Sequence, residues 1–287
     1  MAMGDVIIIV ESGATKSDWR ILDADGKIVK RFSRPGINIS TMMLEDVERT
    51  LKEAFIAEEL VEASGCFFLY TAGVVTWEIR AAVARLIKSV SRITEIDVQD
   101  DLLGAARAVC GHEPGIAAIL GTGSNACYYD GVTITRAVYS GGFILGDEGS
   151  AAALGKMFLA DYIKGLVPSS LVDSFRKEFD TTYAGIVEGV YQSSSPSGYL
   201  GSFAPFLVRH ASDAYVDKLL NQNFQSFVDR ILLRYDATTY PVGIVGGFGW
   251  ACKDRLLSIL KQNGILSSRF LKAPIDGLCE YHRINKS

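Results

Sequence analysis

Two short glycine-containing turns stand out because each could hold an anion. The first, residues 11–15, follows an apolar β-branched run at 6–10 and precedes a more polar strand predicted at 16–22. Small residues let backbone amides approach a phosphate closely, and Thr15 and Lys16 would add a hydroxyl group and a positive charge. Taken alone, this turn is equally consistent with an ordinary hairpin.

The chain repeats the same pattern further along. Residues 116–120 are apolar, 121–124 form the turn Gly-Thr-Gly-Ser, and 125–129 continue as a strand. In both copies an Asp-Gly pair, at 25–26 and 130–131, then turns the chain into a third strand. The repeat predicts two domains of like topology, each offering a hairpin that could hold the phosphates of a nucleotide.

Two acidic pairs lie where a strand gives way to a helix. Asp100 and Asp101 follow a strand predicted at 93–98. Ligands of open α/β sheets gather at this end of a strand, and phosphoryl transfer needs a group that accepts the proton of the attacking hydroxyl. One of the two aspartates could instead simply cap the helix that follows. Asp147 and Glu148 precede another helix and could merely favour its N-terminus.

The spacing of apolar residues predicts alternating strands and helices around these positions. In the first half, helices at 44–63, 77–91 and 102–110 and strands at 66–70 and 93–98 give a mixed sheet flanked by helices. Residues 193–198 are the most loop-like stretch. In the second half we expect helices at 149–164, 169–179, 184–192, 212–235, 250–262 and 279–285, and strands at 241–245 and 270–273.

Composition narrows the class of protein. The 287 residues are 48% hydrophobic and 22% charged, which is typical of a soluble globular protein with one large or two medium cores. A net charge of -4 gives no electrostatic case for nucleic acid or an anionic membrane. No apolar run reaches the ~20 residues of a membrane helix, and no secretory leader is expected, so we predict a cytoplasmic protein. The five cysteines and three histidines lack metal-binding spacing.

Four segments together resemble a known superfamily. Residues 11–18, 121–125 and 246–247 are similar to the two phosphate motifs and the adenosine motif of the sugar kinase, heat-shock ATPase and actin superfamily. Within it, Gly-Phe-Ile-Leu-Gly-Asp-Glu-Gly-Ser at 142–150 is similar to the signature of N-acetylglucosamine kinases and the related BadF/BadG/BcrA/BcrD-type ATPases. The resemblance covers nearly the whole chain.

The resemblance implies an α/β fold of two ribonuclease H-like domains, the actin-like ATPase fold, with a nucleotide cleft between them. The first domain would span 1–116 and be joined by a C-terminal helix at about 274–287. The second would span 117–273 and contain helical insertions. The implied cofactors are ATP and Mg²⁺, and hinge closure on substrate is expected.

The resemblance also implies roles for individual residues. Asp101 matches the base that takes the proton of a sugar hydroxyl, and Glu11 matches the carboxylate that orients magnesium through water. The implied nucleotide contacts are Ser12, Gly13, Thr15, Lys16, Gly121, Thr122, Gly123, Gly246, Gly247 and Ala251. The implied sugar contacts are Asn38, Ser124, Asn125, Ser140, Gly141, Gly142 and Asp147.

One position departs from the family pattern. The family generally has aspartate where this chain has Glu11, and the extra methylene moves the carboxylate by ~1.5 Å. Magnesium demands a near-ideal octahedral shell, so the shift matters. Either the turn adjusts to Glu11, or metal affinity and rate are reduced; the sequence leaves both open.

These observations favour an ATP-dependent kinase that converts N-acetylglucosamine, or a similar amino sugar, to its 6-phosphate. One alternative is the ATPase that activates a dehydratase or CoA reductase, which would bring cysteines to an iron–sulfur cluster at a dimer interface. No cysteine of this chain is convincingly placed for that role. A second alternative is a protein that senses a sugar or a nucleotide without catalysing a reaction. The expected partner is a small-molecule sugar, with a homodimer possible and neither nucleic acid nor membrane expected.

Overall fold

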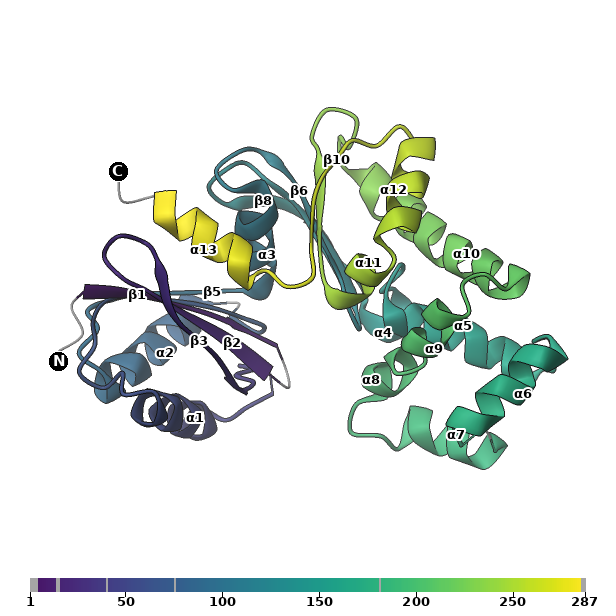
Figure 1. The fold of residues 1–287 in the computed structure, drawn as a ribbon, viewed down its shortest axis with the longest axis horizontal. Helices are drawn as coiled ribbons and strands as arrows, with labels where there is room; N and C mark the ends of the chain where they lie inside the picture. Colours follow the sequence, from purple (N-terminus) through teal and green to yellow (C-terminus); the bar gives the residue numbers. More distant parts are fainter. Residues whose placement is uncertain (1–4, 14–15, 40, 75, 181, 285–287) are drawn as a thin grey trace. The chain divides into compact units, whose positions relative to one another are not determined.

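The computed structural model describes residues 5–13, 16–39, 41–74, 76–180 and 182–284 (Figure 1). The chain forms two compact units. The first comprises Met1–His112 together with Pro274–Ser287, and the second comprises Glu113–Ala273. Within the described residues no helix is long and apolar enough to cross a membrane.

The first unit is built on a five-stranded sheet in the order β3-β2-β1-β4-β5. The strands β1 (Asp5–Ser12), β2 (Lys16–Leu22) and β3 (Ile28–Pro35) form an antiparallel meander, and β4 (Ser64–Thr71) and β5 (Glu95–Gln99) run parallel to β1. The central strand β1 is buried on both faces, which explains its unbroken apolar run.

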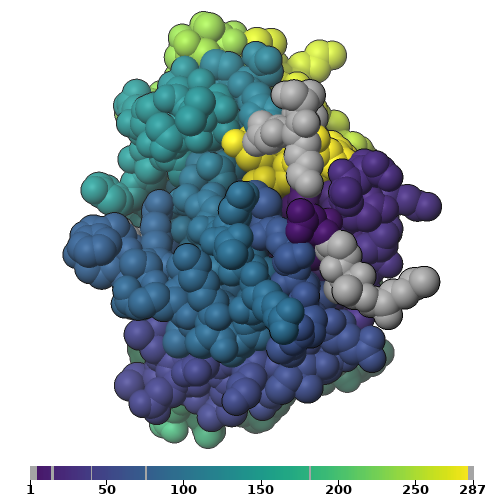
Figure 2. Space-filling view, turned by 90° about the vertical axis from the view of Figure 1, so that its left-hand side faces the viewer, coloured from purple at the N-terminus to yellow at the C-terminus, as the bar shows by residue number. Residues whose placement is uncertain are grey.

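Helices cover both faces of this first sheet. On one face, α1 (Leu44–Ala57) and α2 (Trp77–Val90) pack over a core that includes Trp19 and Phe67. On the other lie α3 (Asp101–Cys110) and the C-terminal α13 (Ile275–Ile284) (Figure 1). In Figure 2 the yellow residues of α13 lie against the purple N-terminal strands. The chain therefore returns to its first sheet at the end.

The second unit repeats this topology. Its sheet has the order β10-β9-β6-β7-β8. The strands β6 (Gly115–Leu120), β7 (Ser124–Tyr129) and β8 (Ile134–Val138) form the antiparallel meander, and β9 (Val242–Val245) and β10 (Ser267–Leu271) are the parallel additions. The predicted α/β class and the repeated pattern of strand, turn and strand are confirmed.

Most of the second unit is helical and forms its own core. Phe158, Phe175 and Phe206 are fully buried in that core and contact one another. The helices are α4 (Gly142–Leu145), α5 (Ala151–Ile163), α6 (Ser169–Glu178), α7 (Tyr183–Tyr191), α8 (Pro196–Gly201), α9 (Ala204–Arg209), α10 (Ala214–Arg230), the 3-10 turn η1 (Leu232–Arg234), α11 (Gly247–Ala251) and α12 (Lys253–Gln262).

Several predicted boundaries differ from the structure for identifiable reasons. The helix predicted at 44–63 ends at Ala57, because Glu59 adopts a left-handed conformation (φ 60°) and the Leu60 amide bonds back to the Phe55 carbonyl at 2.8 Å. The stretch predicted as loop at 193–198 contains the start of α8, where Pro196 occupies a first-turn position that suits proline.

Candidate active site

The first unit places a tight turn at the end of β1, where the sequence predicts a phosphate-binding hairpin. The turn closes through the Gly13 amide, which donates to the Lys16 carbonyl at 3.0 Å. Ser12 is buried, and its hydroxyl oxygen accepts the Ile37 amide at 2.6 Å. Because Asn38 follows directly, Ser12 fixes the loop that carries this predicted sugar contact. The predicted phosphate turn and the predicted sugar loop are therefore coupled.

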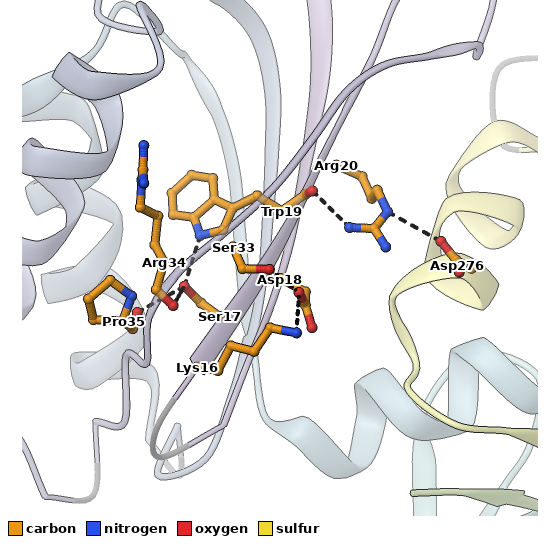
Figure 3. A network of polar contacts seen from close by, with 9 residues as sticks. All are labelled: Lys16, Ser17, Asp18, Trp19, Arg20, Ser33, Arg34, Pro35 and Asp276. Atoms are coloured by element: carbon orange, nitrogen blue, oxygen red, sulfur yellow. Dashed lines mark hydrogen bonds and ion pairs between the residues drawn. The ribbon is translucent and has the colours of Figure 1, made fainter. Parts of the chain in front are cut away.

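Three carboxylates interact beside this turn. Glu11 lies opposite Asp18 in the register of β1 and β2. Asp18 Oδ1 is bonded by Lys16 Nζ at 2.9 Å and by the Ser33 hydroxyl at 2.6 Å (Figure 3). The pKa of Glu11 is raised to about 7, chiefly by burial and then by the negative charges of Asp18 and Asp101, while Lys16 opposes them. The predicted metal carboxylate and the predicted base thus act on each other electrostatically.

The adjacent Asp100 and Asp101 have different roles at the start of α3. Asp100 Oδ1 accepts the Leu103 amide at 2.8 Å, so Asp100 is the helix cap. Asp101 is the first helical residue, and burial, followed by the charge of Asp100, raises the pKa of its carboxyl group. A raised pKa makes a carboxylate a stronger base. The capping interpretation therefore accounts for Asp100, and Asp101 stays the candidate base.

In the second unit, the turn between β6 and β7 is clamped to the beginning of α5. The Gly121 amide donates to the Gly123 carbonyl at 3.0 Å and closes the turn. The Ala151 amide, the first of α5, donates to the Gly121 carbonyl at 3.0 Å. The Ala152 amide donates to the Thr122 carbonyl at the same distance. The helix therefore fixes the conformation of this predicted phosphate turn.

Asp147 joins the same turn to the loop at 140–147. It is 7% exposed, and its Oδ1 accepts the Ser124 amide at 3.3 Å. Its own amide donates to the Ser140 carbonyl at 3.0 Å. A Cβ on Gly123 would lie 3.0 Å from Asp147 Oδ2, so a larger residue there would crowd this carboxylate. Three of the predicted sugar contacts are therefore close to one another.

The backbone of Asp147 is also unusual. Its φ is 55°, a left-handed conformation that non-glycine residues rarely adopt. Such strain persists only where the surroundings impose it, and it concentrates at functional sites. Burial raises the pKa of the Asp147 carboxyl group, while the Ser124 amide and Lys156 oppose that shift. A buried, strained carboxylate with spare acceptor capacity is suited to binding hydroxyl groups.

Other predicted sugar contacts lie around Asp147, and one supporting residue was missed. Gly141 and Gly142 have φ of 75° and 66° where the loop enters α4. Asn125 Oδ1 accepts the Ala126 amide at 2.9 Å, which occupies one of its acceptor sites.

The missed residue is Asn223 of α10, a buried amide that accepts from the Gly149 amide and donates to the Ser150 carbonyl, both at 3.1 Å. A polar residue within the apolar stripe of a helix was the available signal.

A cavity of about 530 Å³ lies in the second unit beside its phosphate turn. Its volume is in the range of small-molecule sites, roughly 300–1,000 Å³. Four predicted nucleotide contacts line it, namely Gly121, Thr122, Gly247 and Ala251. The sequence analysis missed the rest of its wall, which is formed by Ala151, Gly201, Ala204, Pro205, Val208, Arg209 and Phe248.

The two predicted adenosine contacts, Gly246 and Gly247, are glycines for different structural reasons. Gly246 has φ 129°, and a Cβ there would lie 2.3 Å from the Leu120 carbonyl oxygen, so this glycine is required by strand packing. Gly247 has no atom within 4 Å of its hypothetical Cβ and lines the cavity. Only Gly247 thus leaves space that a ligand could occupy.

Comparison with known proteins places the chain in a family. No protein-family model matches it. A crystal structure from Porphyromonas gingivalis, provisionally assigned as an N-acetylglucosamine kinase, is 34% identical and has a TM-score of 0.89, with 98% of this chain and 100% of that chain covered. The chain belongs to this N-acetylglucosamine kinase family of sugar kinases.

Two further relatives agree with this family. An N-acetylmuramic acid/N-acetylglucosamine kinase from Clostridium acetobutylicum is 29% identical over 157 residues, which are 52% of this chain and 50% of that protein. The match thus spans about half the length of that relative. A ROK family glucokinase from Streptomyces griseus, solved with glucose and AMPPNP, shares the fold at 16% identity, with a TM-score of 0.59 and 96% and 98% of the two chains covered. The actin-like ATPase fold is therefore confirmed.

Some assigned roles remain predictions. Lys16 is an exposed ammonium that pairs with Asp18 and lowers the pKa of Glu11, and its contact with a nucleotide stays a prediction. Thr15, a predicted phosphate contact, lies outside the described residues. No set of three or more His, Cys, Asp or Glu side chains among the described residues is placed to enclose a metal ion.

Proposed function

We propose that this protein transfers the γ-phosphoryl group of ATP to N-acetylglucosamine and produces the 6-phosphate. The observation that carries the proposal is that α3, which begins at Asp101, packs on β1, which ends beside Glu11, and that the charge of Asp101 raises the pKa of Glu11, while Asp100 is occupied as the helix cap. Phosphoryl transfer needs a base and a charge-neutralising site close together. The family relationship supports the amino sugar as acceptor.

The nucleotide would use the second unit's cavity and turn. The small residues Gly247 and Ala251 give the base and ribose room, and Gly121 and Thr122 bring the wall of the cavity to the phosphate turn. In the first unit, the Gly13 turn would contribute further phosphate contacts. Asp147, with the Ser124 amide and the loop at 140–142, would hold sugar hydroxyls.

In the reaction, an Asp101 oxygen accepts the proton of the sugar 6-hydroxyl while the 6-oxygen of the sugar forms a bond to the γ-phosphorus. The bond from phosphorus to the bridging oxygen breaks, and ADP leaves. Burial favours this proton acceptance because it raises the pKa of Asp101.

The residues present fit a magnesium ion that accompanies ATP. Glu11 and Asp18 face each other across two strands, and the negative charge of Asp18 raises the pKa of Glu11, a repulsion that a cation would relieve. Because no group of three or more His, Cys, Asp or Glu among the described residues could hold the ion, these carboxylates would act through water, as is common for magnesium. When bound, the ion would neutralise charge on the β- and γ-phosphates.

The test is ADP release with ATP and magnesium across glucose, glucosamine, N-acetylmannosamine and N-acetylglucosamine. We expect N-acetylglucosamine to stimulate release most strongly, with phosphorus-coupled NMR signals placing the phosphate on C6. ATP binding without stimulation by any sugar would favour the sensor or activator alternatives instead.

The role of Asp101 has a matched control in its neighbour. Asp101→Asn should lower kcat by about 10²–10⁴-fold while ATP affinity is retained. Asp100→Asn keeps a capping side chain and removes the same charge, so it should have a much smaller effect. Equal losses in both variants would contradict the assignment of Asp101 as the base.

A further inference from the structure

A single buried amide joins α10 to the segment that leads into α5, the helix on which α10 packs (Figure 1). Asn223 is 1% exposed and lies on the apolar side of α10, where Phe224 and Phe227 are also buried. Its Oδ1 accepts the Gly149 amide, and its Nδ2 donates to the Ser150 carbonyl, both at 3.1 Å. Burial of an amide costs free energy, so apolar side chains usually occupy such positions. The proposed function assigns no task to this side chain.

The segment 147–152 connects a predicted sugar contact with the predicted phosphate turn. At its start, Asp147 carries the carboxylate that would bind sugar hydroxyls. At its end, the amides of Ala151 and Ala152 donate to two carbonyls of the turn between β6 and β7, each at 3.0 Å. Only residues 148–150 separate these two ends. A shift of these three residues would therefore displace both the sugar contact and the phosphate turn.

The bonds from Asn223 hold this segment in a conformation that the chain rarely adopts. Asp147 and Gly149 are both left-handed, with φ of 55° and 79°. The Ser150 amide donates to the Asp147 carbonyl at 3.1 Å, so the residue that Asn223 binds is itself bonded to Asp147. A strained backbone persists only where its surroundings impose it. Asn223 is thus part of what imposes the conformation of Asp147.

A second link between α10 and the segment is much more exposed. Arg230, the last residue of α10, forms an ion pair with Glu148, and the Arg230 side chain is 67% exposed. Water screens such a surface pair and weakens it. Water does not reach the buried bonds of Asn223, so their loss would leave the Gly149 amide without a partner. Asn223 is therefore the stronger of the two links.

We propose that Asn223 is a positioning residue that keeps the Asp147 carboxylate and the phosphate turn correctly placed for phosphoryl transfer. It acts through the backbone of Gly149 and Ser150. A reaction between two bound substrates depends on their mutual geometry, and a misplacement of about 1 Å can lower the rate about 10²-fold. The inference rests on the proposed function, since it places the sugar at Asp147 and the nucleotide at the phosphate turn.

The first test is Asn223→Leu, which keeps a side chain of similar size and branching but removes both hydrogen bonds. We expect kcat to fall about tenfold or more, and KM for N-acetylglucosamine and KM for ATP to rise together. Loss of a direct sugar contact would raise KM for the sugar alone. Steady-state kinetics at a temperature well below the Tm of the variant would measure all three values.

Asn221→Leu is the matched control on the same helix. Asn221 also forms two side-chain hydrogen bonds, donating to Asp217 at 3.0 Å and accepting from Arg255 at 2.7 Å. Neither bond involves the segment 147–152. The control should therefore leave kcat and both KM values close to those of the wild type, even if its Tm falls. Unchanged kinetics in folded Asn223→Leu, or equal losses in the two variants, would overturn the proposal.

A conservative variant keeps the proposal testable if Asn223→Leu does not fold. In Asn223→Asp, a protonated carboxyl group can still accept the Gly149 amide and donate to the Ser150 carbonyl, whereas an ionised one can only accept. Burial should raise the pKa of this new carboxyl group to about 6–8. The ratio of kcat in Asn223→Asp to kcat in the wild type should therefore be highest at about pH 6 and fall towards pH 9. A ratio that does not change with pH would overturn the proposal.

The remaining outcome separates this inference from the proposed function. If no sugar stimulates turnover of the wild type, the proposed function fails, and calorimetry with ADP decides on Asn223. Because Asn223 also fixes the phosphate turn, Asn223→Leu should bind ADP about fivefold or more weakly than Asn221→Leu. Equal affinity of the two variants for ADP would overturn the role of Asn223.

Discussion

Glu11, the proposed magnesium-orienting carboxylate, carries a cost in stability. Its pKa in the folded protein, about 7, lies above the ordinary glutamate value, chiefly because of burial and then because of Asp18 and Asp101. For an acid with a raised pKa, the stabilising contribution is complete below about pH 4.5 and is lost as the pH rises to about 7. Above pH 7 the charged side chain therefore opposes folding in the absence of a cation.

This predicts that Glu11→Gln stabilises the magnesium-free protein at high pH. At pH 8 we expect a gain of about 2 kcal/mol, seen as a Tm higher by several degrees, and a much smaller difference at pH 4.5. Thermal melts in EDTA at both pH values provide the measurement. A Tm difference that does not vary with pH would contradict the raised pKa. The same variant should lose kinase activity.

Asp147 gives a second prediction at the scale of one residue. Asn tolerates the left-handed conformation that Asp147 adopts (φ 55°), so Asp147→Asn should fold normally. Loss of the charged acceptor should raise KM for N-acetylglucosamine by about 10–100-fold, the usual worth of one hydrogen bond to a charged group. KM for ATP should change little. Steady-state kinetics with each substrate varied in turn would separate the two, and an equal rise in both would count against a sugar contact.

At the scale of elements, α3 is the helix that presents Asp101, and one side chain anchors it. Arg107 donates to the Tyr70 hydroxyl at 2.8 Å and to Asp97 at 3.3 Å, which joins α3 to β4 and β5. The Tyr70 hydroxyl is also bonded to His282 Nε2 of α13 at 2.8 Å. Tyr70 and His282 are buried and the Arg107 side chain is 13% exposed, so Arg107 fixes the position of α3 on the sheet.

Arg107→Met should therefore loosen α3 without touching the reacting atoms. We expect a loss of roughly 2 kcal/mol in stability and a fall in kcat of about tenfold, with KM for ATP nearly unchanged. Chemical denaturation and steady-state kinetics would measure both effects. Arg107→Lys keeps the charge but not the forked geometry, and it should recover part of each. An unchanged kcat in a folded Arg107→Met protein would show that α3 needs no such anchor.

The sequence predicted the elements that have strong local patterns and missed those that depend on packing. The apolar run of β1 and the Gly-Thr-Gly-Ser turn were sufficient to place both meanders. The short helix α9 was not predicted, although Ala204 and Arg209 line the cavity of about 530 Å³ that we propose for the nucleotide. Its six residues are too few for a periodic signal, and tertiary contacts decide its conformation. The residue types alone did not distinguish the helix cap from the base in the pair Asp100 and Asp101, because an aspartate suits both roles. The family resemblance assigned the base to Asp101, and the structure shows that Asp100 is the cap.

At the scale of the whole molecule, each unit has its own core. The core of the first includes Trp19 and Phe67, and that of the second includes Phe158 and Phe224; no residue belongs to both. A domain is a unit that folds independently, and no folding measurement tests the domain boundary predicted near residue 116, so that boundary stays a prediction. The contact-defined boundary falls between His112 and Glu113, and the second unit is a single continuous segment.

The segment 113–273 should therefore fold alone and retain part of the nucleotide site. All residues that line the 530 Å³ cavity lie within it, as does the turn that Ala151 and Ala152 clamp. We expect cooperative thermal unfolding and binding of ADP about 10–100-fold weaker than in the full chain, because the fragment lacks the phosphate contacts that we propose for the Gly13 turn. Calorimetry with ADP on the fragment and on the full chain would measure this. As a control, Gly247→Val fills the open space beside Gly247 and should abolish binding in both proteins. A folded fragment with no affinity for ADP would place the nucleotide elsewhere, and an unfolded fragment would show that the second unit is not a domain.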